Sequence, residues 1–378
     1  MNPSVPFNRP TLAGSELSYV ADAINRARIS GDGDYTDRCQ QFLCQSVGAR
    51  AAYLTPSCTH ALELAALLLN VGPGDEVIVP SFAFVSAANA FVLRGARPVF
   101  IDSRPDTLNL DEQQLEGLIT PRTRAIVVVH YAGVACAMEE IIAIARRHGV
   151  PVVEDNAHGL FAKCRGRHLG TFGAFAAQSF HETKNFSCGE GGALLLNEMR
   201  YSDRAETIRQ KGTDKGRMLR GQRDRYSWVD VGSSYSLSDL LAAFLLAQFE
   251  QREAIQNTRQ RIWERYEVEL RDWAVRQGIR LPIVPPDCEQ PYHLFYLLLP
   301  TAEVRERLIE HLKQRSIVAV FHYLPLNTSA MGQRFGGKVG QCPIAEDVSE
   351  RLLRLPLYVG LEGAPQSQVL RALRVFST

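Results

Sequence analysis

The strongest constraint on the fold is an alternation of short apolar runs and helical stretches between residues 76 and 184. The predicted strands are Glu76–Pro80, Pro98–Ile101, Ala125–His130, Pro151–Glu154 and Ala174–Phe180. The predicted helices between them are Ala87–Arg94, Leu110–Leu118 and Ala137–His148. Such alternation is typical of a mostly parallel sheet flanked by crossover helices, whose ligands bind at the carboxyl ends of the strands. We therefore predict an α/β protein with its site at that edge.

The length of the chain, 378 residues, allows a large domain and a smaller one. Residues 1–10, with three prolines, are predicted to form an extended arm. A long helix is predicted from about Leu237 to Leu270, and beyond Trp273 the pattern changes to a smaller α+β unit. Other predicted elements are the helices Ser15–Ala27, Tyr35–Val47, Arg204–Arg209 and Ala302–Gln314, and the strands His293–Leu299 and Ile317–Tyr323. We expect a large domain over residues 1–250, and the long helix with a small domain over residues 251–378.

Composition narrows the class of protein. Apolar residues make up 46% and charged residues 22% of the chain, as in ordinary soluble globular proteins. The formal charge of +1 gives no overall attraction to nucleic acid or to an anionic membrane. No early apolar run resembles a signal peptide, and no apolar stretch is long enough to span a bilayer. We predict a cytoplasmic protein without nucleic-acid or membrane partners.

The cysteines favour reduced thiols over disulfides or a metal centre. Eight are scattered along the chain without a CxxC pair or a Cys/His ligand spacing. They are Cys39, Cys44, Cys58, Cys136, Cys164, Cys188, Cys288 and Cys342. No metal site is predicted, and Cys188, although close to Lys184, fits a small apolar filler better than a nucleophile.

Polar residues follow two of the predicted buried strands. The run that begins at Pro151 stops on Glu154 and Asp155, and the run Ala174–Phe180 is followed by His181 to Lys184. A carboxylate or a lysine at the end of a buried strand is costly to desolvate unless it is paired or used. A cofactor pocket would explain these residues.

Lys184 and Asp155 suggest which cofactor. A lysine that bonds covalently to an aldehyde must lose its proton near neutral pH, which a low-dielectric setting favours. Pyridoxal phosphate also requires an acid that keeps its pyridinium nitrogen protonated. The alternatives are that Lys184 is a solvated turn residue, and that Asp155 caps a helix or pairs with an arginine.

These residues resemble a known family, the DegT-type sugar-nucleotide aminotransferases. The resemblance is carried by Glu154–His158, Ser179–Asn185 and Gly189–Gly192, and it runs through nearly the whole chain. Other strings that share it are TPSCT (55–59), NAFVLRG (89–95), VHYAGVAC (129–136), SFHETKN (179–185), GSSY (232–235), AVFHY (319–323) and ERLLRLPL (350–357). It implies a fold type I pyridoxal phosphate-dependent transferase, in which a large domain with a mostly parallel sheet carries a smaller C-terminal α+β domain.

The resemblance also implies a reaction and an assembly. Glutamate would give its amino group to a nucleotide-linked 4-keto-6-deoxyhexose, in the narrowest interpretation dTDP-4-keto-6-deoxyglucose, which would become dTDP-4-amino-4,6-dideoxygalactose. The active site would lie at the subunit interface of a homodimer.

Several site residues follow from the family pattern. The catalytic residues implied are Lys184 and Asp155, and the cofactor-binding set is Ser57, Cys58, Thr59, Phe84, Asp155, His158, Ser179, Lys184 and Ser234. Residues 57–59 precede a helix, where free amides and the helix dipole favour a phosphate, although capping alone would also explain them. Many members have an asparagine at the position of Ser234, which reaches the phosphate of the partner subunit's cofactor.

Substrate contacts are expected from three further segments. The candidates are Gly31, Arg217, Arg220, His322 and Tyr323. The two arginines lie in Lys211–Arg225, a basic segment predicted to be an irregular loop, whose guanidinium groups suit a diphosphate or simply face solvent. Near the histidine and the tyrosine, Asn327 stands where relatives have a histidine that approaches the sugar nucleotide.

Rival functions stay open at this stage. A same-fold sugar dehydratase would have histidine in place of Lys184, so the lysine argues against it. A non-catalytic ligand sensor would not need both Lys184 and Asp155. An aminotransferase that forms another epimer, or that acts at another sugar position, is not separated by the sequence.

Overall fold

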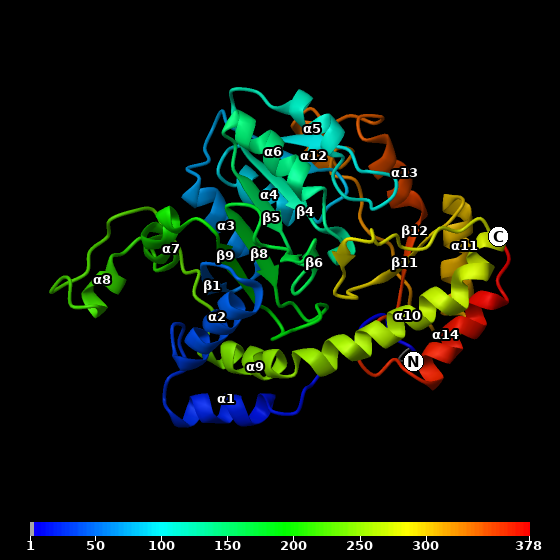
Figure 1. The fold of residues 1–378 in the computed structure, drawn as a ribbon, viewed down its shortest axis with the longest axis horizontal. Coiled ribbons are helices and arrows are strands. Elements are labelled where there is room, and N and C mark those ends of the chain that lie inside the picture. The colour runs from blue at the N-terminus through cyan, green and yellow to red at the C-terminus, as the bar shows by residue number, and fades with distance from the viewer. Residues whose placement is uncertain (1–3) are drawn as a thin grey trace.

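The computed structural model describes residues 4–378 and is built around one seven-stranded sheet (Figure 1). The strand order is β1-β9-β8-β5-β4-β2-β3. Their bounds are β1 (Ala51–Thr55), β9 (Gly192–Leu196), β8 (Phe175–Ser179), β5 (Val152–Asp155), β4 (Thr123–Val129), β2 (Glu76–Pro80) and β3 (Arg97–Ile101). Strands β3, β2, β4, β5 and β8 run parallel, whereas β9 is antiparallel to both β8 and β1. The predicted α/β class with a mostly parallel sheet is confirmed.

Alternate residues of each strand supply two different cores, because successive side chains point to opposite faces. Val77 and Val153 pack on the face covered by α3 (Cys58–Leu68), α4 (Ser86–Val92) and α7 (Ser202–Arg209). Ile78 and Val152 pack on the opposite face. The helices on that face are α5 (Glu112–Leu118) and α6 (Met138–His148), with α2 (Asp34–Val47) and α9 (Asp239–Glu250) beside them. Helix α1 (Glu16–Asn25) packs against α9.

The C-terminal part forms a second core around a two-stranded sheet. Strands β11 (Phe295–Leu298) and β12 (Leu352–Leu355) are antiparallel, and their residues Phe295 and Leu353 pack with Trp263 and Tyr266 of the long helix α10 (Arg252–Arg276). The other helices here are α11 (Ala302–Lys313), α12 (Ala330–Arg334), α13 (Pro343–Arg351) and α14 (Ala364–Arg374). The remaining elements are β6 (Lys163–Cys164), β7 (Arg167–His168), β10 (Cys288–Glu289) and the 3₁₀ turns η1 (Tyr131–Gly133) and η2 (Met199–Tyr201).

The single helix predicted from Leu237 to Leu270 is wrong, because the structure has two. Helix α9 ends at Glu250, Gln251 leaves the helical region with φ −102° and ψ 19°, and α10 starts at Arg252. The break lets α9 pack beneath the large sheet while α10 runs away from it to the second core (Figure 1). We propose this break as the boundary between domains 1–250 and 251–378.

Two other predicted elements need correction. Ile317–Tyr323 is not a continuous strand: only Ile317 and Val320 form bridges, to Val5 and Arg354 respectively. The chain leaves the sheet after Val320. The basic segment Lys211–Arg225 is not wholly irregular, since it contains the short helix α8 (Lys215–Leu219). Of the predicted arm, residues 1–3 lie outside the described residues.

Candidate active site

The carboxyl ends of the parallel strands open into a cavity of about 840 Å³. Strand β5 delivers Asp155 at its last residue, and β8 delivers Ser179 in the same way. Lys184 reaches the cavity from the loop that follows β8, and Cys58 from the first turn of α3. The edge of the sheet predicted to bind ligand is thus the edge where the structure gathers these side chains.

Lys184 is half-buried in this cavity. Burial lowers the pKa of its ammonium group to about 8, although Cys58 and Asp155 act in the opposite direction. Among residues 4–378 its amine has no ion pair and no side-chain hydrogen bond. A substantial fraction of the amine is therefore neutral near physiological pH, which a nucleophile or a proton carrier requires.

Asp155 lies in the same cavity and has almost no protein partner. Its carboxylate accepts one hydrogen bond, from the Ala157 N–H at 3.1 Å, and burial raises its pKa. The neighbouring Glu154 points to the other face, where His130 Nε2 and the N–H groups of Gly170, Phe172 and Gly173 surround its carboxylate at 2.7 to 3.0 Å. Asp155 thus keeps its hydrogen-bonding capacity for a ligand, and no arginine pairs with it in the described part of the chain.

The start of α3 provides the group of donors suited to a phosphate. Ser57 is the N-cap, and its hydroxyl accepts from His60 N–H at 3.2 Å, so the capping interpretation is correct for that side chain. Ser57, Cys58 and Thr59 also line the cavity. The first amides of a helix have no intrahelical partner, and the positive end of the dipole points at the same place. Burial raises the pKa of the Cys58 thiol well above its ordinary value, so it stays neutral beside a phosphate.

Phe82 and Phe84 lie in different environments, as the family pattern implies. Phe82 is 1% exposed and packs edge-on against Tyr131 and Tyr323 in the core. Phe84 is 55% exposed and lines the cavity with one side of its ring against Tyr323. Phe84 is therefore the ring available to a flat cofactor.

His158 holds a defined tautomer. Its Nδ1 accepts from the Ala132 N–H at 3.3 Å, so in the neutral ring the proton resides on Nε2 and is donated to the Tyr323 hydroxyl at 3.3 Å. Burial keeps the pKa of His158 well below its ordinary value, and the ring is neutral. Since the Tyr323 oxygen accepts this bond, its own proton is left for a ligand in the cavity.

The C-terminal segments complete the cavity with residues that sequence reasoning only partly found. His322 and Tyr323 were predicted and line it, with Tyr131 Oη 3.2 Å from His322 Nδ1. His293 was missed: its Nδ1–H donates to Asn185 Oδ1 at 2.9 Å, next to Lys184 in sequence. Burial lowers the pKa of His293 and of His322, so this wall is built of neutral rings.

The other lining residues that were missed include Phe7, Asn8 and Arg354. Asn8 Nδ2 donates to the Glu182 carbonyl at 3.1 Å, so the arm closes over the loop that carries Lys184. The sequence context could have identified Arg354 as a candidate, since an arginine inside the apolar run Leu352–Leu357 must either reach solvent or have a partner.

Four predicted residues do not line the cavity of their own chain. Gly31 packs against Ser236 and Leu237, where an added Cβ would lie 2.7 Å from both. Arg217 and Arg220 pair with Asp203 and Glu206 at 3.5 and 2.7 Å on the outside of the molecule. Ser234 is exposed. For these residues a role in the site requires a second subunit, which stays a prediction.

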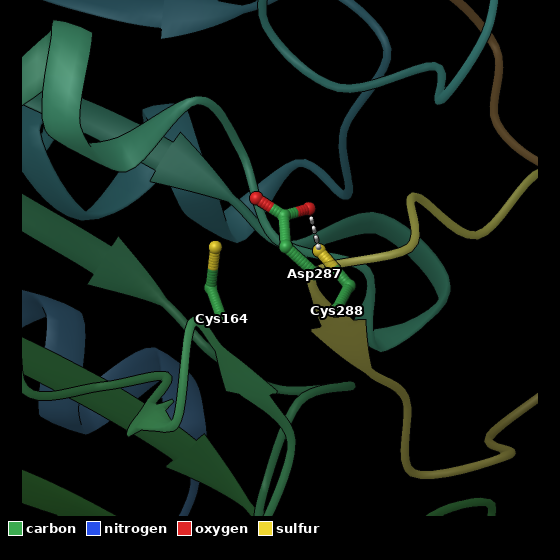
Figure 2. Close-up of side chains that lie close together, drawn as sticks. All are labelled: Cys164, Asp287 and Cys288. Carbon is green, nitrogen blue, oxygen red and sulfur yellow. Dashed lines mark hydrogen bonds between the residues drawn. The ribbon is translucent and has the colours of Figure 1, made fainter.

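One group of side chains in residues 4–378 has the spacing of metal ligands, namely Cys164, Asp287 and Cys288 (Figure 2). None of the three lines the cavity. The Asp287 carboxylate already accepts from Arg165 Nε at 2.9 Å, and the Cys288 thiol donates to its other oxygen at 3.9 Å. An arginine that holds the carboxylate competes with any cation, so we assign no metal role to this group. All eight cysteines are unpaired thiols.

The residues present fit pyridoxal phosphate. The cavity combines a lysine with a depressed pKa, a carboxylate with open acceptor positions, an exposed aromatic face and the start of a helix. With the mostly parallel sheet, these features define the class of fold type I pyridoxal phosphate enzymes.

Comparison with known proteins gives the family. The model of the DegT/DnrJ/EryC1/StrS aminotransferase family matches residues 10–374, and the chain belongs to this family. It is 32% identical over 381 residues to the spore coat polysaccharide biosynthesis protein SpsC of Bacillus subtilis, which covers 99% of this chain and 97% of that protein. Aminotransferases of the family use pyridoxal phosphate, so the cofactor and the enzyme class predicted from the sequence are confirmed.

Solved structures agree with this assignment. The aminotransferase TlmJ from Streptoalloteichus hindustanus superposes with a TM-score of 0.89 at 30% identity and covers 98% of both chains. DesV from S. venezuelae, solved in complex with a ketimine intermediate, has a TM-score of 0.89 at 31% identity and covers 99% of this chain and 98% of its own. The chain is thus similar to sugar aminotransferases along nearly its whole length.

Proposed function

We propose that this aminotransferase takes the amino group of glutamate and transfers it to dTDP-4-keto-6-deoxyglucose, with dTDP-4-amino-4,6-dideoxygalactose as product. The support for amino transfer is the one cavity that Lys184 and Asp155 share. The support for this substrate is the set of strings, from TPSCT to ERLLRLPL, that resemble dTDP-4-amino-4,6-dideoxygalactose transaminases. Several of these strings supply lining residues of the cavity, among them Cys58, Lys184 and Tyr323.

Each residue has a proposed part in the reaction. Bound pyridoxal phosphate supplies an aldehyde that accepts amines and a ring that takes up electrons. The neutral amine of Lys184 would hold the cofactor and, once released, move a proton to and from the donor's α-carbon. Asp155 would keep the ring nitrogen protonated, because its carboxylate accepts only one hydrogen bond from the protein and has acceptor positions left for the ring N–H. Ser57, Thr59 and Ser179 would hold the phosphate, and Phe84 would pack on the ring.

We further propose a homodimer in which each subunit completes the site of the other. The segment after α7 supports this, since it carries exposed apolar side chains as well as the predicted residues Arg217, Arg220 and Ser234. The exposed apolar residues are Leu219, Tyr226, Trp228, Val229 and Val231. Exposed apolar surface of this kind is typical of an interface. Sedimentation of the purified protein tests the dimer, and a monomer at micromolar concentration would contradict it.

The location proposed is the cytoplasm, and its support is the composition of the chain. Among residues 4–378, no helix has the combination of length and apolarity that crossing a bilayer demands.

The substrate is tested with glutamate and a panel of dTDP- and UDP-linked keto sugars. We expect amino transfer to dTDP-4-keto-6-deoxyglucose, with the galacto configuration at C4 in the NMR spectrum of the product. A product with another configuration at C4, or with the amine at another position of the sugar, would mean that the enzyme forms a different amino sugar from the one proposed. Loss of water without amino transfer would indicate a dehydratase. A cofactor absorbance band that borohydride removes, without turnover of any keto sugar, would indicate a sensor.

A further inference from the structure

Arg354 is the one arginine among the described residues that lines the catalytic cavity. It lies in β12, between Leu353 and Leu355, which are both buried in the core of the C-terminal part. Because side chains alternate along a strand, the arginine points away from that core. Its backbone pairs with Val320 on the segment that carries His322 and Tyr323. The register of the small sheet therefore fixes a guanidinium group in the wall of the cavity.

This guanidinium group is only partly satisfied by the protein. Its Nη2 donates to the Phe321 carbonyl at 3.1 Å, and its carbon lies 4.7 Å from the centre of the Phe7 ring. Its Nε is buried and has no hydrogen-bond partner within residues 4–378. No carboxylate of these residues lies within ion-pair distance. Burial lowers the pKa of Arg354, but the group stays charged at neutral pH.

Arg354 is half-buried and its Nε is fully buried, so the lack of a counter-ion costs the ligand-free protein free energy. An anionic ligand that binds there would remove this cost. The acidic side chains that line the cavity are Asp155 and Glu190. Asp155 accepts its hydrogen bond from Ala157, and Glu190 lies 3.7 Å from His181. Neither pairs with Arg354. The wall beside the arginine consists of neutral groups, including His322 and Tyr131. The charge that meets Arg354 must therefore come from a bound molecule.

Two kinds of anion could supply this charge if the proposed function holds, namely a carboxylate of the amino donor and the diphosphate of the nucleotide. The guanidinium fork matches both. Their distances from the reacting carbon differ. The α-carboxylate is attached directly to the carbon that reacts, whereas the diphosphate is separated from C4 by the hexose ring. Arg354 donates to the Phe321 carbonyl, and the same segment carries Tyr323, which contacts His158 in the cavity that Lys184 lines. This proximity favours the carboxylate.

We propose that Arg354 is the receptor for the α-carboxylate of the amino donor. This inference rests on the proposed amino transfer. It explains why the site keeps an unpaired guanidinium in its apolar wall: the donor and the keto sugar occupy the cavity in turn, and only the donor brings a carboxylate next to the reacting carbon. The same contact would make an amine without a carboxylate a poor donor.

The test uses the holoenzyme and two non-reacting probes, glutarate and dTDP, with binding measured by calorimetry. In Arg354→Gln we expect the Kd for glutarate to rise roughly 10- to 100-fold, because a charge-assisted bidentate contact is lost. The Kd for dTDP should stay within about twofold. The Kd of Arg354→Lys for glutarate should lie between that of the wild type and that of Arg354→Gln, because lysine keeps the charge and loses the guanidinium fork. The matched control is Arg351→Gln, on the same segment but paired with Asp347 and outside the cavity.

Three results would overturn the inference. One is glutarate binding that Arg354→Gln leaves unchanged, and the second is wild-type enzyme that does not bind glutarate. The third is a loss of dTDP affinity equal to the loss of glutarate affinity, which would make Arg354 a diphosphate receptor. Circular dichroism and melting temperature show whether each variant is folded. Wild-type enzyme that binds glutarate but not dTDP would instead refute the proposed nucleotide-sugar substrate, so the two failures are distinguishable.

Discussion

The two edges of the central sheet bury charges in opposite ways. At the amino edge Glu76 is 1% exposed, and it accepts from Arg97 at 2.6 Å, Arg122 at 2.7 Å and Thr120 at 2.6 Å. At the carboxyl edge Asp155 accepts one backbone bond, and Lys184 has no charged partner in the described chain. Paired burial at one edge stabilises the fold, whereas unpaired burial at the other leaves interactions for a ligand.

The same contrast occurs within one strand. Glu154 and Asp155 are neighbours on β5 and point to opposite faces. Four hydrogen bonds saturate Glu154, and one reaches Asp155. Burial by itself therefore does not distinguish the two carboxylates, whereas the number of donors around each one does, and it favours Asp155 as the carboxylate that is free to bind a ligand.

The largest effect is expected at the unpaired edge. Lys184→Ala should lower the turnover of amino transfer by about 10⁴-fold or more, because it removes the amine proposed to move the proton. Turnover is measured with glutamate and the keto sugar under saturating conditions. Lys163→Ala is the control, since Lys163 pairs with Glu289 outside the cavity. Transamination that survives in Lys184→Ala would remove the lysine from the mechanism.

A substitution at the amino edge, where the buried carboxylate is paired, should change the stability of the fold. Glu76→Ala is expected to lower the free energy of unfolding by about 2 to 3 kcal/mol, because charge-assisted hydrogen bonds to a buried carboxylate are lost while the two arginines, both more than half exposed, are solvated. Urea unfolding at pH 7 measures this loss, and the turnover of the remaining folded protein should be unchanged. A variant as stable as the wild type would mean that the cluster contributes nothing to the fold.

The pH dependence of that loss sharpens the comparison. Burial opposes the charge on Glu76, but the hydrogen bonds from Arg97, Thr120 and Arg122 outweigh it and lower its pKa to about 2. A carboxylate with a depressed pKa contributes stability that is complete above its unfolded pKa and is lost as the pH falls toward the folded value. The difference between wild type and Glu76→Ala should therefore shrink between about pH 4.5 and pH 2.

Asp155→Asn should separate function from stability. We expect turnover to fall about 10²- to 10³-fold, because a preorganised charge opposite the cofactor ring is lost. Its free energy of unfolding should stay equal or increase, since an unpaired buried charge is removed. Glu154→Gln should do the reverse and destabilise the protein, because its carboxylate accepts three backbone N–H bonds. If both variants changed turnover and stability in the same way, the proposed difference in role between Asp155 and Glu154 would be wrong.

The smallest effect concerns the cofactor-free protein. Because Lys184 has a pKa of about 8 in the fold against 10.5 in the unfolded chain, the unfolded state binds more protons between these values and stability rises with pH across that window. Below about pH 8, Lys184→Met should be more stable than the wild type by roughly 1 to 2 kcal/mol, because solvent screens part of the shift at a half-buried amine, and the gap should close toward pH 10.5. Urea unfolding of both proteins at pH 7 and pH 10 checks this, and a gap independent of pH would contradict the depressed pKa.

Much of the unpaired edge was predictable, because its residues are local signals. Asp155 and Ser179 terminate apolar runs, Ser57 precedes a helix, and Lys184 follows a strand closely. In a parallel sheet such positions converge whatever the details of packing. His293 and Phe7 could not be placed in the same way, because they reach the cavity from segments distant in sequence.

The sequence by itself determined the α/β class and the family, and it predicted the ligand-binding edge and the pair of Lys184 and Asp155, since each depends on short-range patterns of apolar and polar residues. The tertiary structure decided which carboxylate is satisfied, where the long helix breaks at Gln251, and that Arg354 faces the cavity without a counter-ion. These outcomes depend on which groups from remote segments come within hydrogen-bond distance. Desolvation and pairing are properties of that three-dimensional arrangement, and the order of residues along the chain does not contain them in readable form.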